Sequence, residues 1–255
     1  MGYPGSKAGM GVWQRIINEI PPHSVYVEAF CGSGVVFRQK RLAPRSILVD
    51  CEPGSLALTC EAAGIALGRD EGPWRSSIAV EREADRGTVE VVVGDAVKLL
   101  QEVKLPMDAV VYCDPPYLLE TRGGRRYYRH EMSARDHRRL LGCLLKLQCR
   151  VLLSGYPSSL YASMLDDWRS IEYRVMTRGG IRQEVLWLNY SEPMELHDYR
   201  YLGSNFRERE KIRRQQAAWR RMLAAMPRHR RLALASVVAS SADIAAGCDG
   251  RPSQG

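Results

Sequence analysis

Short apolar runs alternate with stretches of mixed polarity along much of the chain. Each run is continuous and rich in β-branched residues, which is typical of strands buried on both faces of a parallel sheet. The runs occupy residues 25–29, 46–50, 89–93, 108–113 and 151–153. The stretches between them favour helices, at residues 34–41, 54–66 and 133–147. This alternation predicts a doubly wound α/β domain.

Two further strands are expected around residue 180. Residues 171–176 and 184–190 are strand-like, and Arg178-Gly179-Gly180 lies between them as a turn. An antiparallel hairpin at one edge would complete a mostly parallel, seven-stranded, Rossmann-like sheet. Residues 68–88 are polar and contain glycine, so we interpret them as an excursion between two strands.

The end of the chain follows a different pattern. Ile212, Trp219, Leu223 and Met226 recur at helical spacing, with arginines around them and Pro227 after them. This pattern predicts a helix over residues 205–226, and residues 232–246 favour another.

Charge separates this end from the rest of the chain. Eleven Lys and Arg residues but only two acidic residues lie between positions 200 and 231, and the net charge of the chain is +8. The remainder is therefore close to neutral. We expect one domain over residues 1–190 and a basic helical extension over residues 191–255. A basic segment of this kind favours a polyanion partner, most simply nucleic acid.

Composition narrows the class of protein. Apolar residues make up 45% of the 255 residues and charged residues 26%, which excludes an intrinsically disordered or collagen-like chain. The seven cysteines form no CxxC pair, so we expect reduced thiols and no zinc site. No apolar run approaches the roughly 20 residues of a membrane span, and residues 1–7 lack the apolar core of a signal peptide. We expect a cytoplasmic protein without a membrane partner.

A glycine turn follows the first expected strand. Phe30-Cys31-Gly32-Ser33-Gly34 connects that strand to a helix, and such turns let backbone amides approach a ligand closely. Asp50 ends the next strand, 16 positions after Gly34. A carboxylate at this place can accept both ribose hydroxyls of a nucleoside-containing cofactor. The turn and the carboxylate together predict such a cofactor.

The block Asp114-Pro115-Pro116-Tyr117 directly follows the fourth expected strand. Because proline has no N–H group, the carbonyl groups of this turn can project without a competing hydrogen-bond ladder. A carboxylate and a proline carbonyl then form two acceptors for one amino group, and the tyrosine ring can stack on a base. Two accepted hydrogen bonds localise the lone pair of an aniline-like nitrogen. The block therefore predicts methyl transfer to an exocyclic amine such as that of adenine.

Taken in order, these blocks resemble the Dam-like DNA adenine-N6 methyltransferases, which depend on S-adenosylmethionine. The resemblance covers residues 1–190. It is carried by Tyr3-Pro4-Gly5-Ser6-Lys7, Phe30-Cys31-Gly32-Ser33-Gly34, Asp50, Gly94-Asp95-Ala96, Asp114-Pro115-Pro116-Tyr117, Leu153-Ser154-Gly155-Tyr156 and the run from Glu184 to Tyr190.

The resemblance implies a role for each block. S-adenosylmethionine would be the cofactor and S-adenosylhomocysteine the product, with no metal, because a sulfonium is already a good leaving group. Tyr3 and Lys7 would lie beside the methionine part of the cofactor, and Phe30, Gly32 and Gly34 would cradle it.

Carboxylates complete the implied site. Asp50 would bind the ribose of the cofactor and Asp95 its adenine amino group. Asp114, Pro115, Pro116 and Tyr117 would hold a flipped adenine of duplex DNA, with Asp114 also beside the cofactor.

The sequence departs from Dam in its recognition region. Dam has a long helical recognition module between the ribose aspartate and the catalytic block, whereas only 63 residues separate Asp50 from Asp114 here. We expect residues 68–88 and 120–132 to read DNA instead. The second segment combines flexible glycines with arginines for phosphates and tyrosines for wedging into a base stack. Its candidate DNA contacts are Arg122, Arg125, Arg126, Tyr127, Tyr128 and Arg129.

Other substrates and roles stay open. RNA adenine, cytosine N4 in DNA, a protein amide, or a nucleic-acid-binding relative without catalysis are the alternatives. The aspartate at position 114 favours DNA adenine, because cytosine-N4 enzymes more often resemble Ser-Pro-Pro-Tyr, and protein-amide and many RNA enzymes Asn-Pro-Pro-Tyr.

The roles of the basic helix and of two histidines also depend on the fold. The helix from residue 205 could contact DNA, pack on the body of the protein, or join a second subunit, and we expect a homo-oligomer built on a dimer. We expect His130 on a loop and His137 on a helix surface, because neither has a second ligand at metal spacing.

Overall fold

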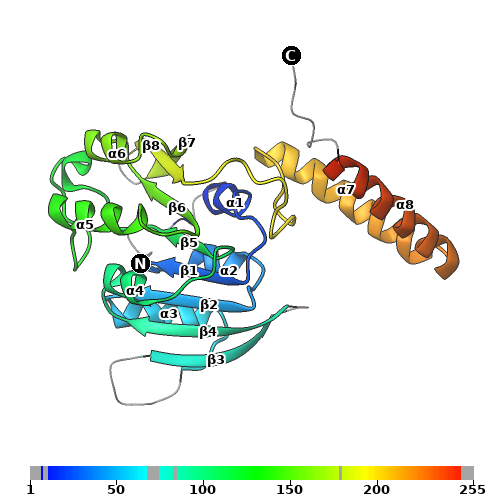
Figure 1. Ribbon diagram of the computed structural model, residues 1–255, viewed down its shortest axis with the longest axis horizontal. Coiled ribbons are helices and arrows are strands. Elements are labelled where there is room, and N and C mark those ends of the chain that lie inside the picture. Colours follow the sequence, from blue (N-terminus) through cyan, green and yellow to red (C-terminus); the bar gives the residue numbers. More distant parts are fainter. Residues whose placement is uncertain (1–6, 8–10, 68–74, 83–84, 178–179, 248–255) are drawn as a thin grey trace. The chain divides into compact units, whose positions relative to one another are not determined.

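The chain divides into two compact units, residues 1–202 and residues 203–255. The computed structural model describes residues 7, 11–67, 75–82, 85–177 and 180–247. In the first unit, helices flank an eight-stranded sheet (Figure 1). Its strands are β1 (Val25–Ala29), β2 (Arg45–Asp50), β3 (Arg75–Arg82), β4 (Asp85–Val93), β5 (Val110–Cys113), β6 (Arg150–Gly155), β7 (Arg169–Thr177) and β8 (Gly180–Leu188). Its helices are α1 (Val12–Ile17), α2 (Val35–Gln39), α3 (Pro53–Ala62), α4 (Ala96–Glu102), the short 3₁₀ helix η1 (Leu119–Arg122), α5 (Ala134–Leu144) and α6 (Ser159–Met164).

The strand order, β3-β4-β2-β1-β5-β6-β8-β7, places the switch point of the sheet at β1. Strand β1 pairs in parallel with β2 on one side and β5 on the other, so that Val27 lies between Ile47 and Val111. The chain moves outward through β2 and β4, then returns to add β5 and β6 on the opposite side. In such sheets the ligand crevice opens beyond the carboxyl ends of the strands at this reversal.

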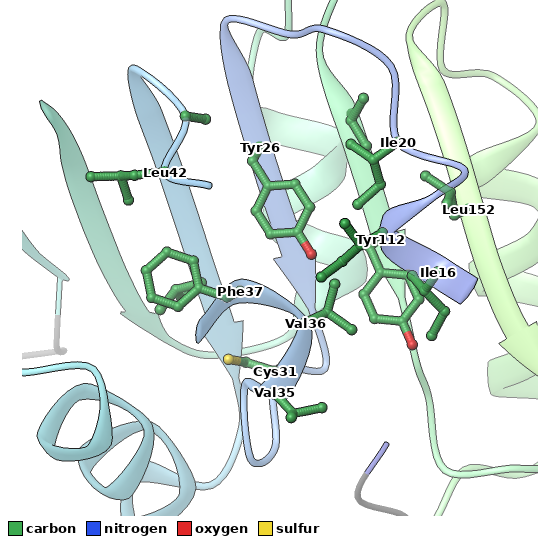
Figure 2. Packing of buried hydrophobic residues seen from close by; sticks show 14 of the residues in the cluster. Ile16, Ile20, Tyr26, Cys31, Val35, Val36, Phe37, Leu42, Tyr112 and Leu152 are labelled. Carbon is green, nitrogen blue, oxygen red and sulfur yellow. The ribbon is translucent and has the colours of Figure 1, made fainter. Parts of the chain in front are cut away.

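Both faces of the central strands are buried, which explains their continuous apolar sequences. One face packs on α1, α2 and α3, where the rings of Tyr26 and Tyr112 project from neighbouring strands toward Val36 of α2 (Figure 2). The other face packs on α4, α5 and α6, with Val27 and Val111 at its centre. Burying a side chain of this size contributes about 1.5–3 kcal/mol to folding. The prediction of a doubly wound α/β fold is confirmed.

The sheet has one strand more than the seven expected. Residues 75–82 form β3, which pairs antiparallel with β4, so the interpretation of this part as an excursion is wrong. Ile78 and Val80 pack partly against the core, while Ser77 and Glu81 are exposed. This two-residue alternation marks a half-buried edge strand, although the segment is mostly polar. Residues 68–74 and 83–84 lie outside the described part of the chain.

The expected hairpin and the expected helix after residue 133 are both present. The hairpin of β7 and β8 is antiparallel, with Tyr173 opposite Glu184, although residues 178–179 of the expected turn are not described. Helix α5 begins with a complete capping box between Ser133 and Asp136, but it ends at Leu144, earlier than expected.

Residues 191–202 belong to the first unit, beyond the boundary expected at residue 190. Asp198 is fully buried and accepts hydrogen bonds from the Arg41 amide and the Arg200 side chain. The Tyr201 ring lies edge-on to Trp13, and its hydroxyl donates to the Gln39 carbonyl. The segment is held on the body of the first unit through both polar and aromatic contacts.

The second unit contains two helices, α7 (Phe206–Ala225) and α8 (Arg228–Gly247), separated at Pro227 as expected. The Asn205 side chain caps α7 by accepting from the Glu208 amide. No residue of α7 is buried, and Trp219 of the apolar stripe is 55% exposed. The homo-oligomer expected from that stripe stays a prediction. Among the described residues, no helix combines the length and apolar character of a membrane span.

Candidate active site

A cavity of about 470 Å³ lies at the carboxyl ends of β1, β2, β4 and β5. Its volume is typical of small-molecule sites. Segments that directly follow these four strands form its inner wall, and residues 127–132 with the start of α5 complete it. The cavity therefore occupies the switch point, where the sequence pattern predicts the cofactor.

The glycine turn after β1 lines this cavity. Gly32 and Gly34 adopt left-handed conformations, with φ of 52° and 54°, and Phe30 does so as well, with φ of 60°. A non-glycine residue in this region stores strain, which persists only where the surrounding structure imposes it. The Gly32 amide donates to Oδ2 of Asp50 at 2.7 Å. The carboxylate that ends β2 therefore fixes the turn that follows β1.

Close packing explains the second glycine of the turn. A Cβ atom at Gly34 would lie 2.2 Å from Cγ2 of Thr59 on α3. The Thr59 hydroxyl also donates to the Gly32 carbonyl at 2.9 Å. Only a residue without a side chain allows the turn, α2 and α3 to meet in this way.

Asp50 and Asp95 both line the cavity, but each already holds part of the protein. Asp50 accepts the Glu52 amide on its second oxygen at 2.8 Å, and burial raises its pKa. Asp95 caps α4 through the amides of Val97 and Lys98. Its other oxygen accepts from the Arg139 guanidinium at 2.7 Å. Burial works against ionisation of Asp95, but Arg139 and the amides outweigh it and lower the pKa of this carboxyl.

Glu28 is a third carboxylate at the cavity and had no role assigned from the sequence. Its Oε2 accepts from the Tyr26 hydroxyl and from the Phe37 amide, each at 2.8 Å. Burial raises its pKa to about 7, against the effect of these two donors. The cavity thus contains a carboxyl group that gains or loses a proton near neutral pH.

Asp114, Pro116 and Lys7 lie at the β5 side of the same cavity. Nζ of Lys7 donates to Oδ1 of Asp114 and to the Tyr117 hydroxyl, both at 2.6 Å. It also lies 3.7 Å from Oε2 of Glu184. Burial alone would lower the pKa of Lys7. The negative charges of Asp114 and Glu184 outweigh the effect of burial, so the pKa of Lys7 is raised. An ammonium nitrogen is therefore held at the carboxylate and the aromatic ring that the sequence pattern assigns to a target amine.

Electrostatics at Asp114 suit a proton acceptor. Burial raises the pKa of its carboxyl, and this effect exceeds the opposing effect of Lys7. The Tyr117 hydroxyl donates to Glu184 at 3.2 Å, and the Tyr173 hydroxyl donates to the same oxygen at 3.3 Å. The Tyr117 ring meets Tyr156 in an edge contact, with 4.6 Å between ring centres. Aromatic and acidic groups thus surround the end of β5.

The segment that follows Tyr117 differs from the expectation. Arg122 is buried, its Nε donates to the Tyr117 carbonyl at 2.7 Å, and its guanidinium pairs with Glu131. The prediction that Arg122 contacts DNA phosphates is therefore wrong, because its donors are committed inside the protein. Arg125 and Arg126 are exposed, as a DNA contact requires.

The last three residues predicted to contact DNA lie at the cavity. Tyr127, Tyr128 and Arg129 line the cavity together with the glycine turn. Arg129 lies 3.5 Å from Glu52, two residues after Asp50 in the sequence. Spacing alone could not reveal this, because the segment turns back over the cavity through two consecutive left-handed glycines, Gly123 and Gly124.

The two histidines separate. His130 is exposed on a loop, as expected, and lies 3.8 Å from Glu52. His137 is fully buried, so its expected place on a helix surface is wrong. Its Nδ1 lies 2.9 Å from the Tyr161 hydroxyl, and burial lowers its pKa to about 4. No group of three or more potential metal ligands occurs among the described residues.

Sequence patterns assign no role to Glu28, Glu131 or Glu184, which lie at or beside the cavity, and Tyr3 lies outside the described residues. Glu184 stands at the start of the apolar run of β8 and is buried. A charged residue beside a buried strand is the sequence feature that could have indicated a role for it. Glu131 offered no such signal, because it stands in a polar loop. Its partners come from positions that only the folded loop brings together.

Comparison with known proteins identifies no family. No family model and no curated protein matches the chain. Among solved structures, a precorrin 8W decarboxylase of Methanobacterium thermoautotrophicum is 17% identical, with coverage of 74% of this chain and 94% of that one and a TM-score of 0.42.

Two other structures have similar scores. TrmK of M. capricolum, solved with S-adenosyl-homocysteine, is 7% identical over 89% of this chain and 92% of that one, with a TM-score of 0.43. An rRNA methylase of Streptococcus thermophilus is 13% identical over 69% and 90%, with a TM-score of 0.36. Likenesses at these scores carry no argument about activity.

Proposed function

We propose that this protein transfers the methyl group of S-adenosylmethionine to the exocyclic N6 amine of a flipped adenine in duplex DNA. The observation that carries the proposal is the position of Asp114 and Tyr117 at the tip of β5, with a nitrogen donor already held at both. A target amine needs the same acceptor and the same ring. The proposed cofactor cavity begins at the same carboxylate.

The residues that line the cavity fit this cofactor. Carboxylates outnumber cationic side chains there, which suits a ligand with a sulfonium and an ammonium group. Gly94 has no atom within 4 Å of where a Cβ would stand, so it leaves space at the wall. Asp50 has lone pairs left beyond its two amide donors and would hold the ribose hydroxyls. Glu28 would face the cationic end of the cofactor.

The chain's own groups supply orientation and proton transfer. S-adenosylmethionine supplies an electrophilic methyl group and a neutral thioether leaving group. Asp114 and the Pro115 carbonyl would accept the two N–H bonds of the amine and direct its lone pair toward the methyl group. As the new N–C bond forms, the nitrogen releases one proton. The raised pKa of Asp114 suits this carboxylate to receive it.

Charge on the second unit supports a nucleic-acid substrate. Arg207, Arg214 and Arg221 recur every seven residues along α7, and all three are exposed. At 1.5 Å per residue, such residues share one face of the helix about 10 Å apart. A row of cations on one face suits the phosphates of a polyanion.

Product analysis tests the proposal directly. The purified protein is incubated with S-adenosylmethionine and plasmid DNA, the DNA is digested to nucleosides, and methylated products are identified by mass. N6-methyladenine supports the proposal, and an Asp114→Ala protein gives the background. N4-methylcytosine as the only product would show that the target is cytosine. Methylation of RNA but not of DNA would show that the substrate is RNA. No methylated product on either nucleic acid would refute catalysis.

A further inference from the structure

Residues 127–132 line the outer side of the cavity, and one carboxylate within this segment, that of Glu131, bonds its backbone. Oε1 of Glu131 accepts the backbone amide of Tyr127 at 2.7 Å and that of Tyr128 at 3.0 Å. Burial opposes ionisation of Glu131, but Arg122 and the two amides outweigh it and lower the pKa of this carboxyl. Both tyrosines line the cavity.

The cation that pairs with Glu131 reaches the base-binding side of the site. The Arg122 guanidinium donates to both oxygens of Glu131, and its side chain is 5% exposed. Its Nε donates to the carbonyl of Tyr117 at 2.7 Å. Its Cζ also lies 5.7 Å and 5.5 Å from the ring centres of Tyr127 and Tyr128. One guanidinium therefore contacts the wall of the cofactor cavity and the backbone of the catalytic block.

We propose that Arg122 and Glu131 are a positioning pair that sets the tyrosine wall against the cofactor and holds Tyr117 in place for the target base. Tyr127 and Tyr128 are then cofactor-binding residues. The pair acts on cofactor affinity through the two amides and on turnover through the Tyr117 carbonyl. This inference rests on the proposed function, because it takes the cavity as the site of S-adenosylmethionine.

The geometry separates this pair from the outer contacts of the same segment. Arg129 and His130 approach Glu52 at 3.5 Å and 3.8 Å, and both side chains are more than half exposed. Exposed ion pairs of this kind contribute little, because water and salt screen them. A buried, bidentate guanidinium–carboxylate pair fixes both position and direction. The inner pair, not the outer contacts, therefore determines where the wall stands.

The test measures cofactor binding and turnover separately. Binding of S-adenosylmethionine to the full-length protein is followed by calorimetry without DNA, and kcat is measured at saturating cofactor on DNA. Glu131→Gln and Arg122→Lys should each weaken cofactor binding at least tenfold and also lower kcat at least tenfold. Tyr128→Ala should weaken binding but leave kcat at saturation within about twofold. Glu61→Gln and Arg138→Gln, exposed changes of the same kind, should alter neither.

A double variant distinguishes a shared role from two separate ones. If the two residues act as one unit, Arg122→Lys with Glu131→Gln should be no worse than the more damaging single variant. Multiplied losses, or normal binding and kcat in both single variants, would overturn the proposal. Circular dichroism and thermal unfolding of each variant show whether it is folded, and Tyr128→Ala tests the wall even where a pair variant unfolds.

Failure of the proposed function would give a different experimental result from failure of the positioning pair. A protein that binds S-adenosylmethionine but methylates no adenine would leave the predicted losses of binding intact. No binding by the unaltered protein would overturn both proposals.

Discussion

At the scale of single residues, the site is a set of carboxylates whose neighbours set their protonation. Asp114 and Glu28 both have raised pKa values because they are buried, whereas Asp95 and Glu131 are lowered by guanidinium groups and amides. These opposite shifts arise around a single cavity. They separate Glu28, whose pKa is raised to about 7, and Asp114, whose pKa is also raised, from two carboxyl groups that are held ionised by cations and amides.

Replacing Asp114 should remove turnover and spare cofactor binding. Asp114→Ala deletes the acceptor of the target amine, so we expect methyl transfer to be abolished while the affinity for S-adenosylmethionine stays within about tenfold of the original. Single-turnover assays and calorimetry measure the two quantities. A variant that keeps more than about a tenth of the original kcat would contradict the assigned role.

The ring of Tyr117 should matter more than its hydroxyl. Tyr117→Ala should weaken transition-state stabilisation by about 1–3 kcal/mol, because a stacking surface is lost. Tyr117→Phe should cost less, since the ring and its edge contact with Tyr156 remain. With 2-aminopurine at the target position, fluorescence should rise as the base leaves the stack. Tight binding without a change in fluorescence would count against base flipping.

His137 should make the fold sensitive to acid. Its pKa is about 4 in the folded chain and near 6.5 when unfolded. The unfolded chain therefore binds a proton first, and stability present above about pH 6.5 is lost as the pH falls toward 4. Relative to His137→Phe, the unaltered protein should lose about 2 kcal/mol between about pH 7.5 and pH 5 in urea unfolding. Equal pH dependence of the two proteins would refute this.

At the scale of elements, the site depends on how turns join strands to helices. The turn after β1 uses three constraints: a strained Phe30, a Gly32 amide bonded to β2, and a Gly34 in contact with α3. The turn after β5 is held from outside, by Lys7 and Arg122. Both turns lie at the carboxyl ends of neighbouring parallel strands, so fixing them fixes the cavity between them.

A methyl group at Gly34 should disrupt the first turn. Gly34→Ala places a Cβ in a left-handed conformation and in collision with Thr59. We expect a loss of at least about 1–2 kcal/mol from the backbone alone and weaker cofactor binding. Gly142→Ala is the matched control, because it has open space within α5 and should stabilise the helix by up to about 1 kcal/mol. Equal unfolding free energies for the two variants would contradict this account.

At the scale of the whole molecule, charge and chemistry occupy different units. The site with its carboxylates belongs to the first unit, and the exposed arginine row of α7 belongs to the second. Under the proposed function, one part would react with a base and another part would hold the phosphate backbone. Such backbone contacts are independent of base sequence and depend strongly on salt.

Neutralising the arginine row should reduce the salt dependence of DNA binding. Replacing Arg207, Arg214 and Arg221 together by Gln in the full-length chain should lower the slope of log K against log salt by up to about 3, because up to three phosphate contacts are lost. Fluorescence anisotropy with a labelled duplex measures this slope. Cofactor affinity should not change.

The matched control removes the same charge elsewhere. Lys104→Gln, Arg138→Gln and Lys146→Gln together remove three exposed cations of the first unit and should leave the slope unchanged. Equal effects of the two triple variants would show that net charge, and not the row on α7, governs binding.

The sequence by itself determined the layers of the fold and the position of the chemistry along the chain. Continuous runs of β-branched residues are typical of strands that are buried on both faces of a parallel sheet. The turn after such a strand lies at the edge of the sheet where ligands bind. The positions of Gly32, Asp50 and Asp114 directly after such runs therefore sufficed to place them at that edge. Strand β3 was not predicted, because its sequence is mostly polar. It forms a strand because it pairs with β4, and that pairing is visible only in the folded chain.

Only the tertiary structure decided which charged groups face each other. Lys7 meets Asp114 across 107 positions of sequence, and Arg122 turns inward because Glu131 and the Tyr117 carbonyl satisfy its guanidinium there. A sequence gives the charge of an arginine, but its partners depend on loop geometry that no periodicity encodes. For the same reason, a segment whose sequence is typical of a DNA-binding loop forms one wall of the proposed cofactor cavity.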